Sequence, residues 1–417
     1  MNLGPFTAPF LYLFRPKYYL RKPQPPARQS VSIPMQRRHF LTSSLTAPLS
    51  AQMLPAAWKS APPPSYLGEL TALLKAAAVP GMVVGAVRAG KPAWTAPLGG
   101  LSSASAAASA APVTPASLFQ AASLTKQLTA HAAHALRASG KLDFDRPLVS
   151  YLDDLPHPTA RTVTLRHVLS HSSGFPNWRF TDRGKPAPAL EPAFPPGSKF
   201  QYSGEGYFYL QRILEEVTGQ GFGQLLAELV MKPAGMTAST LVWDPATLDR
   251  TALPHNRRGE PRQNWDKSAR ALRDYAARLG KPVEHLRYAD YAAFTRDSGD
   301  PPLPNWMLPN AAASLVTSAS DYARFLAWVL KTPNLDQPAV KMNDSLSWGL
   351  GWGIERVGAR TFLWQWGDNG GYKNFVLAEP ATGDALFVFT NGDSGARLYE
   401  RVLTRATGME HPAFFWL

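Results

Sequence analysis

Strand-like segments at the two ends of the folded chain place the strongest constraint on its architecture. Residues 83–87 and 92–98 predict two strands that turn at Ala89 and Gly90. Strand patterns return only near the C-terminus, at residues 351–356, 361–366, 375–378 and 385–390. The segment 140–330 between them is dominated by helical periods and loops. We therefore expect an α/β fold of the α+β type, with one antiparallel sheet built from both chain ends and flanked by helices.

Helical periods locate the other elements and divide the chain into two lobes. Helices are predicted at Ser65–Lys75, at Ser123–Ser139, from about Tyr207 to Gly219, at Ala311–Leu330 with a cap at Ser320 or Thr317, and at Ala396–Thr407, which closes the chain. Residues 61–140 and 311–417 should form the α/β lobe. Residues 141–310 should form a mainly helical lobe, and its charged, loop-rich part, 244–310, is expected to shape substrate choice.

The N-terminal 60 residues resemble a targeting segment and are not counted as part of the folded region. Residues 1–34 are a basic, Pro-rich extension that fits a mis-assigned start, a linker or an anchor. In residues 35–60, Arg37 and Arg38 precede a short apolar run, which resembles a twin-arginine export signal followed by a spacer. The expected location is therefore periplasmic or secreted. A basic disordered tail is the alternative.

Composition removes several classes of function. The chain has no cysteine, which excludes disulfides, thiolate metal sites and a cysteine nucleophile. Eight Lys or Arg and no acid lie in residues 1–60, so most of the net charge of +13 belongs to that segment. No nucleic-acid-binding motif accompanies the charge, and no apolar run is long enough to span a membrane. We expect no nucleic-acid partner, no integral membrane span and a monomer.

Ser123 and Lys126 form the best candidate for catalysis. Residues three apart on a helix lie on one face, one turn apart. The free N–H groups and the positive dipole end at a helix start favour an alkoxide-like nucleophile at Ser123. Lys126 can accept the proton only as a neutral amine, so its pKa must fall well below about 10.4. Ser-x-x-Lys by itself is a weak signal.

Four further motifs follow in order, and together they make the signal specific. They are the segments 164–175 (TLRHVLSHSSGF), 200–207 (FQYSGEGY), 315–325 (LVTSASDYARF) and 365–372 (QWGDNGGY). With Ser123-Leu-Thr-Lys126, they resemble the serine β-lactamase/penicillin-binding-protein superfamily. The branch they resemble contains class C β-lactamases, D,D-carboxypeptidases and esterases. The resemblance covers about residues 65–405.

The resemblance implies a role for each matching residue. Ser123 matches the acylated nucleophile, Lys126 the group that takes its proton, and Tyr202 the tyrosine that relays protons to the leaving group. The strand with Gln365, Trp366 and Gly367 would line the opposite wall and bind substrate. The N–H groups of Ser123 and Asp368 would form the oxyanion hole. No metal or organic cofactor is implied.

Two departures from the family pattern affect the substrate. Gly204 stands where the second motif usually has Asn, which binds the substrate amide. Gln365 stands where the third motif usually has Lys or His, which anchors a carboxylate. Asp368 would further disfavour an anionic substrate, although Lys373 could compensate. These changes favour a serine hydrolase that acts on a carboxylic ester or small amide. The alternatives are a D-amino-acid peptidase or carboxypeptidase, a β-lactamase, and a non-catalytic binding protein.

Other chemistry-bearing residues are interpreted as structural. His131 and His134 lack a third metal ligand nearby, and His167 and His171 lack the Glu of a His-Glu-x-x-His motif. Asp321 is expected to be a cap or support. The aromatic residues Trp178, Trp243, Tyr288 and Trp306 are expected to serve in packing more than as a substrate platform. The absence of a Gly-x-Ser-x-Gly elbow argues against an α/β-hydrolase.

Overall fold

The computed structural model describes residues 60–103, 111–155, 161–179, 190–262, 266–297 and 309–417. The twin-arginine pair and the rest of residues 1–59 lie outside this part, so the expected export signal stays a prediction, and Trp306 also lies outside it. Among the described residues, no helix has the length and apolarity needed to cross a bilayer.

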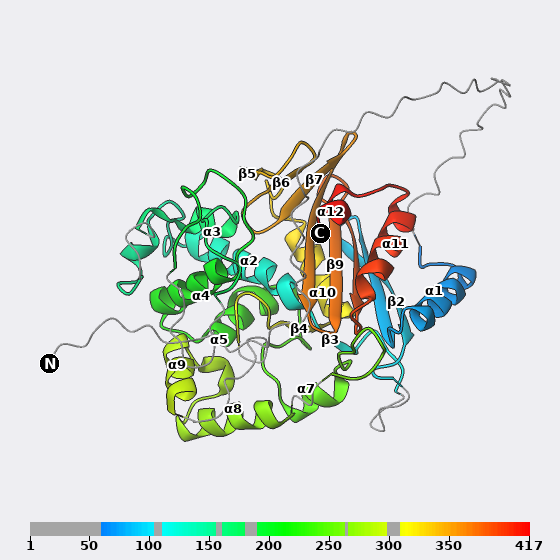
Figure 1. Cartoon of the computed structure of the whole chain (residues 1–417), viewed down its shortest axis with the longest axis horizontal. Helices are drawn as coiled ribbons and strands as arrows, with labels where there is room; N and C mark the ends of the chain where they lie inside the picture. The colour runs from blue at the N-terminus through cyan, green and yellow to red at the C-terminus, as the bar shows by residue number, and fades with distance from the viewer. Residues whose placement is uncertain (1–59, 104–110, 156–160, 180–189, 263–265, 298–308) are drawn as a thin grey trace, which may run out of the picture.

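One eight-stranded antiparallel sheet joins the two ends of the chain (Figure 1). Its order is β2-β1-β10-β9-β8-β7-β6-β5, so β1 near the N-terminus pairs directly with β10 near the C-terminus, and β2 pairs with β1 at the edge. The strands are β1 Gly81–Arg88, β2 Lys91–Gly99, β5 Val340–Lys341, β6 Leu346–Trp348, β7 Gly353–Val357, β8 Arg360–Asn369, β9 Tyr372–Glu379 and β10 Asp384–Thr390. The predicted α/β class and the sheet built from distant segments are confirmed.

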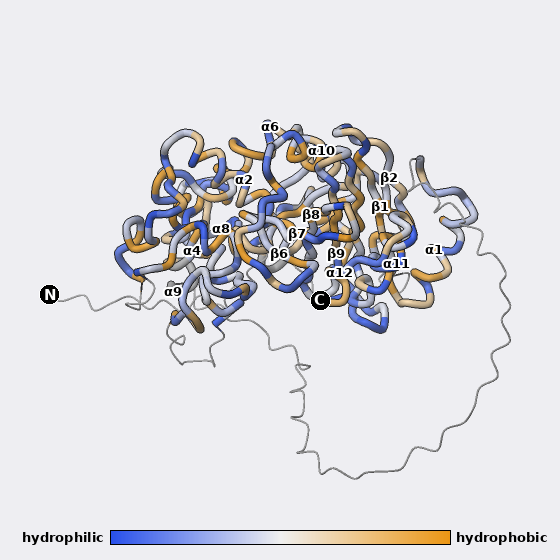
Figure 2. Tube along the Cα trace, turned by 90° about the horizontal axis from the view of Figure 1, so that it is seen from above, coloured by the Kyte–Doolittle hydropathy of each residue, from blue (hydrophilic) through white to orange (hydrophobic). Residues whose placement is uncertain are grey.

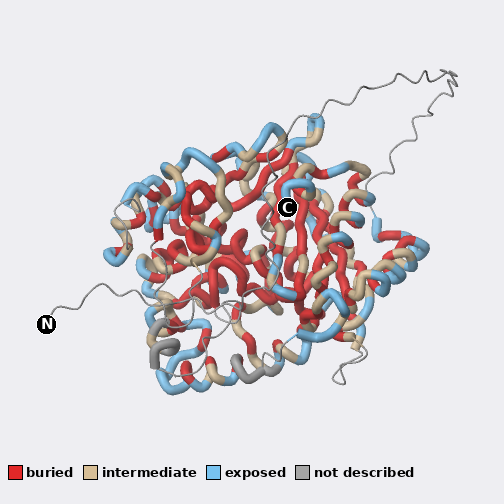
Figure 3. Tube along the Cα trace, viewed as in Figure 1, coloured by how far each residue is buried: buried red, intermediate tan, exposed pale blue. Residues whose placement is uncertain are grey.

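Helices cover both faces of this sheet, so its central strands are apolar on both sides. Val83 of β1 packs in the core cluster that includes α10, while its neighbour Val84 packs in the cluster that includes α1 and α11. Figure 3 shows these central strands buried along their length. The flanking helices are α1 Pro64–Ala76, α10 Ala319–Val329, α11 Gly395–Thr407 and α12 Pro412–Trp416.

A helical region lies beside the sheet (Figure 1), and Figure 2 shows apolar segments within both parts. Its elements are α2 Thr125–Ala138, α3 Leu165–Leu169, α4 Gly204–Thr218, α5 Phe222–Leu226, α6 Lys232–Ala234, α7 Pro245–Arg250, α8 Asp266–Arg278 and α9 Tyr288–Asp297, with the short turns η1 Ala122–Leu124, η2 Leu148–Ser150, η4 Ala227–Met231 and η5 Val283–His285. α4 ends where Gly219 adopts φ +71, as the glycine predicted. The segment 244–310 was expected to be loop-rich, but it carries α7, α8 and α9.

The helix predicted over Ala311–Leu330 is wrong in its first half. Residues 316–318 form β4, which pairs with β3, Leu118–Gln120, and the helix begins only at Ala319. Its N-cap is Ser318, whose hydroxyl accepts a hydrogen bond from the N–H of Asp321, and not Ser320 or Thr317. The prediction that 396–407 closes the chain is also wrong, because α12 follows.

Candidate active site

Ser123 lies in a tight turn directly before α2. The turn is shaped by Ala122, a non-glycine residue with φ +52, which is a strained backbone conformation. The conformation is held from both sides: the Thr125 hydroxyl donates to the Ala122 carbonyl at 2.6 Å, and the N–H of Ala121 donates to Leu315 O at 2.7 Å. The Ser123 side chain is only half-buried, so the turn presents its hydroxyl at the edge of the core.

Lys126 stands one turn along from Ser123 and is almost completely buried. Its Nζ lies 3.1 Å from Ser123 Oγ and donates to the carbonyl of Ala312 at 2.8 Å. It also lies over the ring of Tyr202, at 4.9 Å from the centroid. Burial lowers the pKa of Lys126 from 10.5 to about 7. A neutral amine that can accept a proton is therefore well populated near neutral pH.

Tyr202 completes the cluster from the segment that precedes α4. Its hydroxyl accepts a hydrogen bond from Gln365 Nε2 at 3.2 Å and is also hydrogen-bonded with Ser123. Burial raises the pKa of Tyr202, and the hydrogen bonds with Ser123 and Gln365 oppose that rise. The phenol therefore stays protonated and can give or take a proton beside the serine oxygen. The structure thus brings the serine, lysine and tyrosine expected from the sequence to one place.

Strand β8 forms the wall opposite Lys126. The amide of Gln365 donates to the Ser123 carbonyl at 3.2 Å as well as to Tyr202, and its Oε1 is buried with no hydrogen-bond partner in the described part of the chain. Gly367 lies where a Cβ would be only 2.3 Å from the Ala121 carbonyl oxygen. Only glycine allows β8 to run this close to the turn that carries Ser123.

A tryptophan occupies the space that a side chain at Gly204 would need. A Cβ at position 204 would be 2.4 Å from the six-membered ring of the half-buried Trp178. Sequence reasoning treated Trp178 as packing and the missing Asn as a simple loss. The structure shows that the two features are linked, because the indole lies over Gly204 and leaves no room for an amide side chain there. The glycine at this motif position is the sequence signal that could have indicated a bulky neighbour.

Lys373, the cation that could compensate for the Lys or His usual at position 365, is already paired. Lys373 and Asp368 face each other on β9 and β8 and form an ion pair. The side chain of Lys373 is 16% exposed, whereas that of Asp368 is 52% exposed. Of these two paired charges, the carboxylate is the more exposed.

The remaining candidates have structural contacts. His171 stacks on Tyr202 with ring centroids 4.2 Å apart, and its Nδ1 accepts the N–H of Ser203 at 3.1 Å. His167 caps α3, and His131 packs edge-on against aromatic rings of α10. The buried Asp321 carboxylate accepts from Ala238 and Ser239 of a neighbouring loop. Within the described ranges, no three acidic or histidine side chains gather as a metal site.

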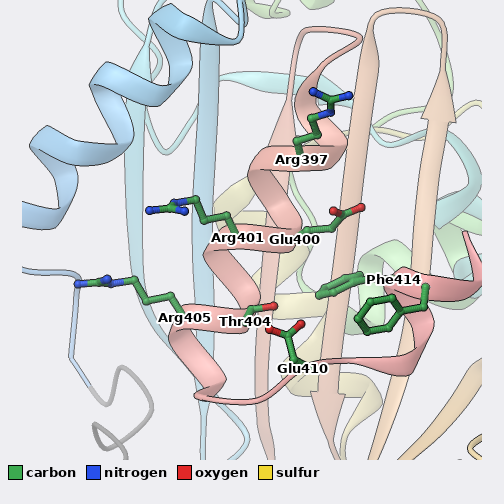
Figure 4. A pocket seen from close by; sticks show the side chains of 8 residues that line it. Arg397, Glu400, Arg401, Thr404, Arg405, Glu410 and Phe414 are labelled. Carbon is green, nitrogen blue, oxygen red and sulfur yellow. The ribbon is translucent and has the colours of Figure 1, made fainter. Parts of the chain in front are cut away.

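A cavity of about 540 Å³ lies on a different part of the surface, between α11 and α12 (Figure 4). Its lining includes none of the residues described above. Arg401 and Arg405 extend away from Phe414, on the side of the helix that faces α1. Arg401 forms an ion pair with Glu69, and Arg405 lies over the ring of Tyr66. These arginines are therefore engaged in holding α1 against α11.

Comparisons with known proteins agree with this fold. The family model described as Beta-lactamase matches residues 69–408. Penicillin-binding protein 4 of Amycolatopsis lactamdurans is 26% identical over 73% of this chain and 81% of its own length. Esterase EstB of Burkholderia gladioli is 27% identical over 63% of this chain and 68% of its own.

Solved structures share the fold. The D-alanine carboxypeptidase AmpC of Burkholderia cenocepacia has a TM-score of 0.61 at 20% identity, over 82% of this chain and 99% of that one. A class C β-lactamase has a TM-score of 0.63 at 16% identity, over 82% and 96%. Fold and family together define a serine hydrolase of the β-lactamase-related type. The chain belongs to the Beta-lactamase family.

Proposed function

We propose that the protein hydrolyses a neutral carboxylic ester or small amide through an acyl-enzyme on Ser123. The observation that carries this proposal is the neutral amide of Gln365 on the wall opposite Lys126. Gln365 stands where the family pattern has the cation that would hold a carboxylate, and the nearby ammonium of Lys373 is paired with Asp368. A substrate carboxylate at this wall would meet a carboxylate, while a neutral group meets no repulsion.

The catalytic cycle we propose uses three side chains. Neutral Lys126 accepts the proton of Ser123 as its oxygen attacks the carbonyl carbon. The N–H groups of Ser123 and Asp368 stabilise the oxyanion. The bond to the leaving group then breaks while Tyr202 gives its proton to the departing oxygen or nitrogen, and Tyr202 regains a proton from the Lys126 ammonium. Water then attacks the acyl-enzyme with the same groups acting in reverse.

The crowded space over Gly204 supports the ester assignment. An amide-binding Asn would need the volume that Trp178 fills. The indole offers an apolar surface to the acyl group, without a hydrogen bond to a peptide amide. The esterase among the relatives is in keeping with this preference.

A substrate panel tests the proposal. Wild type and Ser123→Ala would be compared on p-nitrophenyl and alkyl esters of short and medium acyl length, a chromogenic cephalosporin and a D-alanyl-D-alanine peptide. We expect hydrolysis of the esters that is lost in Ser123→Ala. Turnover of the anionic cephalosporin or peptide with a higher kcat/KM than every ester would overturn the proposal in favour of a β-lactamase or carboxypeptidase.

We also propose that the Arg37–Arg38 segment directs export, because the twin-arginine pair precedes a short apolar run. N-terminal sequencing of the protein recovered from the periplasm tests this. A mature form that begins after residue 57 supports export, and an intact N-terminus on protein confined to the cytoplasm contradicts it.

A further inference from the structure

The C-terminal helix α12 is fixed to the sheet by a buried polar anchor. The carboxylate of Glu355 on β7 is hydrogen-bonded to Nδ1 of His411 and accepts the N–H of Ala413 at 3.1 Å. Neither side chain of that pair is exposed. Phe414 adds an apolar anchor, because its ring packs against Phe375 of β9 at 4.9 Å, and it lies beside α11 in Figure 4. The helix is therefore held at a defined place.

From this anchored helix, Trp416 contacts both segments that flank the candidate catalytic tyrosine. Its ring centroid lies 5.5 Å from Trp366 of β8 and 5.6 Å from Phe200, which precedes α4. It also contacts Trp364, at 5.8 Å. Trp416 thus bridges the strand that forms one wall of the site and the segment that carries Tyr202.

The ring of Tyr202 depends on these neighbours for its position. Trp366 lies 4.5 Å from it and His171 lies 4.2 Å from it, so two rings hold the phenol. The Tyr202 hydroxyl oxygen lies 3.2 Å from Gln365 Nε2, at the long end of the hydrogen-bond range. A small displacement of the phenol would therefore break this hydrogen bond. A shift of Trp366 would therefore move the phenol relative to Ser123.

We propose that Trp416 is a positioning residue for Tyr202, acting through Trp366 and Phe200. The inference rests on the proposed function, in which Tyr202 gives its proton to the leaving oxygen. That transfer occurs while the bond between this oxygen and the carbonyl carbon breaks. Without Trp416, the phenol has more freedom and delivers that proton less often. A leaving group that departs as a stable anion needs no such proton, so its release should be affected much less.

Two esters with the same acyl group test this. Ethyl butyrate releases an alkoxide that must be protonated, whereas p-nitrophenyl butyrate releases a stabilised phenolate, and both form the same acyl-enzyme. We expect Trp416→Ala to lower kcat/KM for ethyl butyrate about 10-fold and for p-nitrophenyl butyrate by less than about 3-fold. Trp416→Phe, which keeps a ring in place, should restore most of the loss.

Phe415→Ala is the matched control, because Phe415 lies on the same helix and is 78% exposed. It should leave both kcat/KM values unchanged. An equal loss on the two esters in Trp416→Ala, or the same selective loss in Phe415→Ala, would overturn the positioning role. If wild type hydrolyses neither ester, the proposed function fails; if it hydrolyses both and Trp416→Ala does so equally well, only the role of Trp416 fails.

Discussion

Replacing Lys126 with Met should abolish activity yet stabilise the folded protein at neutral pH. Burial lowers the pKa of Lys126 from 10.5 to about 7, which corresponds to roughly 5 kcal/mol of preference for the neutral amine. Between about pH 7 and pH 10.5, the unfolded chain binds more protons at this lysine than the folded chain does. The free energy of unfolding of the wild type therefore rises as the pH increases through this window.

Methionine removes that pH-dependent cost but also removes two hydrogen bonds, to Ser123 Oγ and to the Ala312 carbonyl. Each bond contributes roughly 1 kcal/mol. At pH 7, Lys126→Met should therefore be more stable than wild type by roughly 2 kcal/mol. Near pH 10 the cost in the wild type has largely vanished, so the variant should be the less stable protein by roughly 1–2 kcal/mol.

Urea unfolding at pH 7 and pH 10, extrapolated linearly to water, measures this reversal. Lys75→Met is the control, because the side chain of Lys75 at the end of α1 is exposed and its removal relieves no desolvation. If Lys126→Met differs from the wild type by the same amount at both pH values, Lys126 does not carry the cost of a buried amine, and its proposed role as a neutral base loses its physical basis.

Three further predictions follow from the geometry of the site. The kcat/KM for a neutral ester should fall about tenfold per pH unit below a midpoint near pH 7, since protonated Lys126 cannot accept a proton; a pH-independent profile from 5 to 8 would contradict this. Gly204→Asn should lower the free energy of unfolding by about 1–3 kcal/mol through its clash with Trp178, and Trp178→Ala should relieve the loss in the double variant; additive losses in urea unfolding would argue against the clash. Gly367→Ala should lower kcat/KM roughly 100-fold or more, because its Cβ would push β8 away from Ala121 and separate the two proposed oxyanion donors. Gly68→Ala, in open space on α1, should have no effect, and equal activity in the two variants would refute this prediction.

The strands at both chain ends and the Ser123–Lys126 pair could be predicted because each depends on the residues of one short segment. The strands at both ends read as continuous apolar runs, since Val83 and Val84 pack on opposite faces of a covered sheet. The Ser-x-x-Lys spacing depends only on helical geometry, so the approach of Ser123 and Lys126 could be expected before any tertiary contact was known.

The errors occurred where long-range pairing overrides local preference. The segment from Ala311 was expected to be helical, yet Val316 pairs with Gln120 in β3. The non-helical backbone before it leaves the carbonyl of Ala312 free to accept from Lys126. No pattern within residues 311–318 encodes that partner. The bulk of Trp178 over Gly204 and the reach of Trp416 to Trp366 likewise join residues that are far apart in the sequence.

Covalent labelling with a fluorophosphonate tests most directly whether Ser123 is a nucleophile activated by Lys126. Folded wild type at pH 8 should acquire one adduct, found by mass spectrometry on the peptide that contains Ser123. The adduct should be absent in Ser123→Ala and form far more slowly in Lys126→Met. Undiminished labelling of Ser123→Ala, or a labelling rate in Lys126→Met equal to that of wild type, would contradict the account.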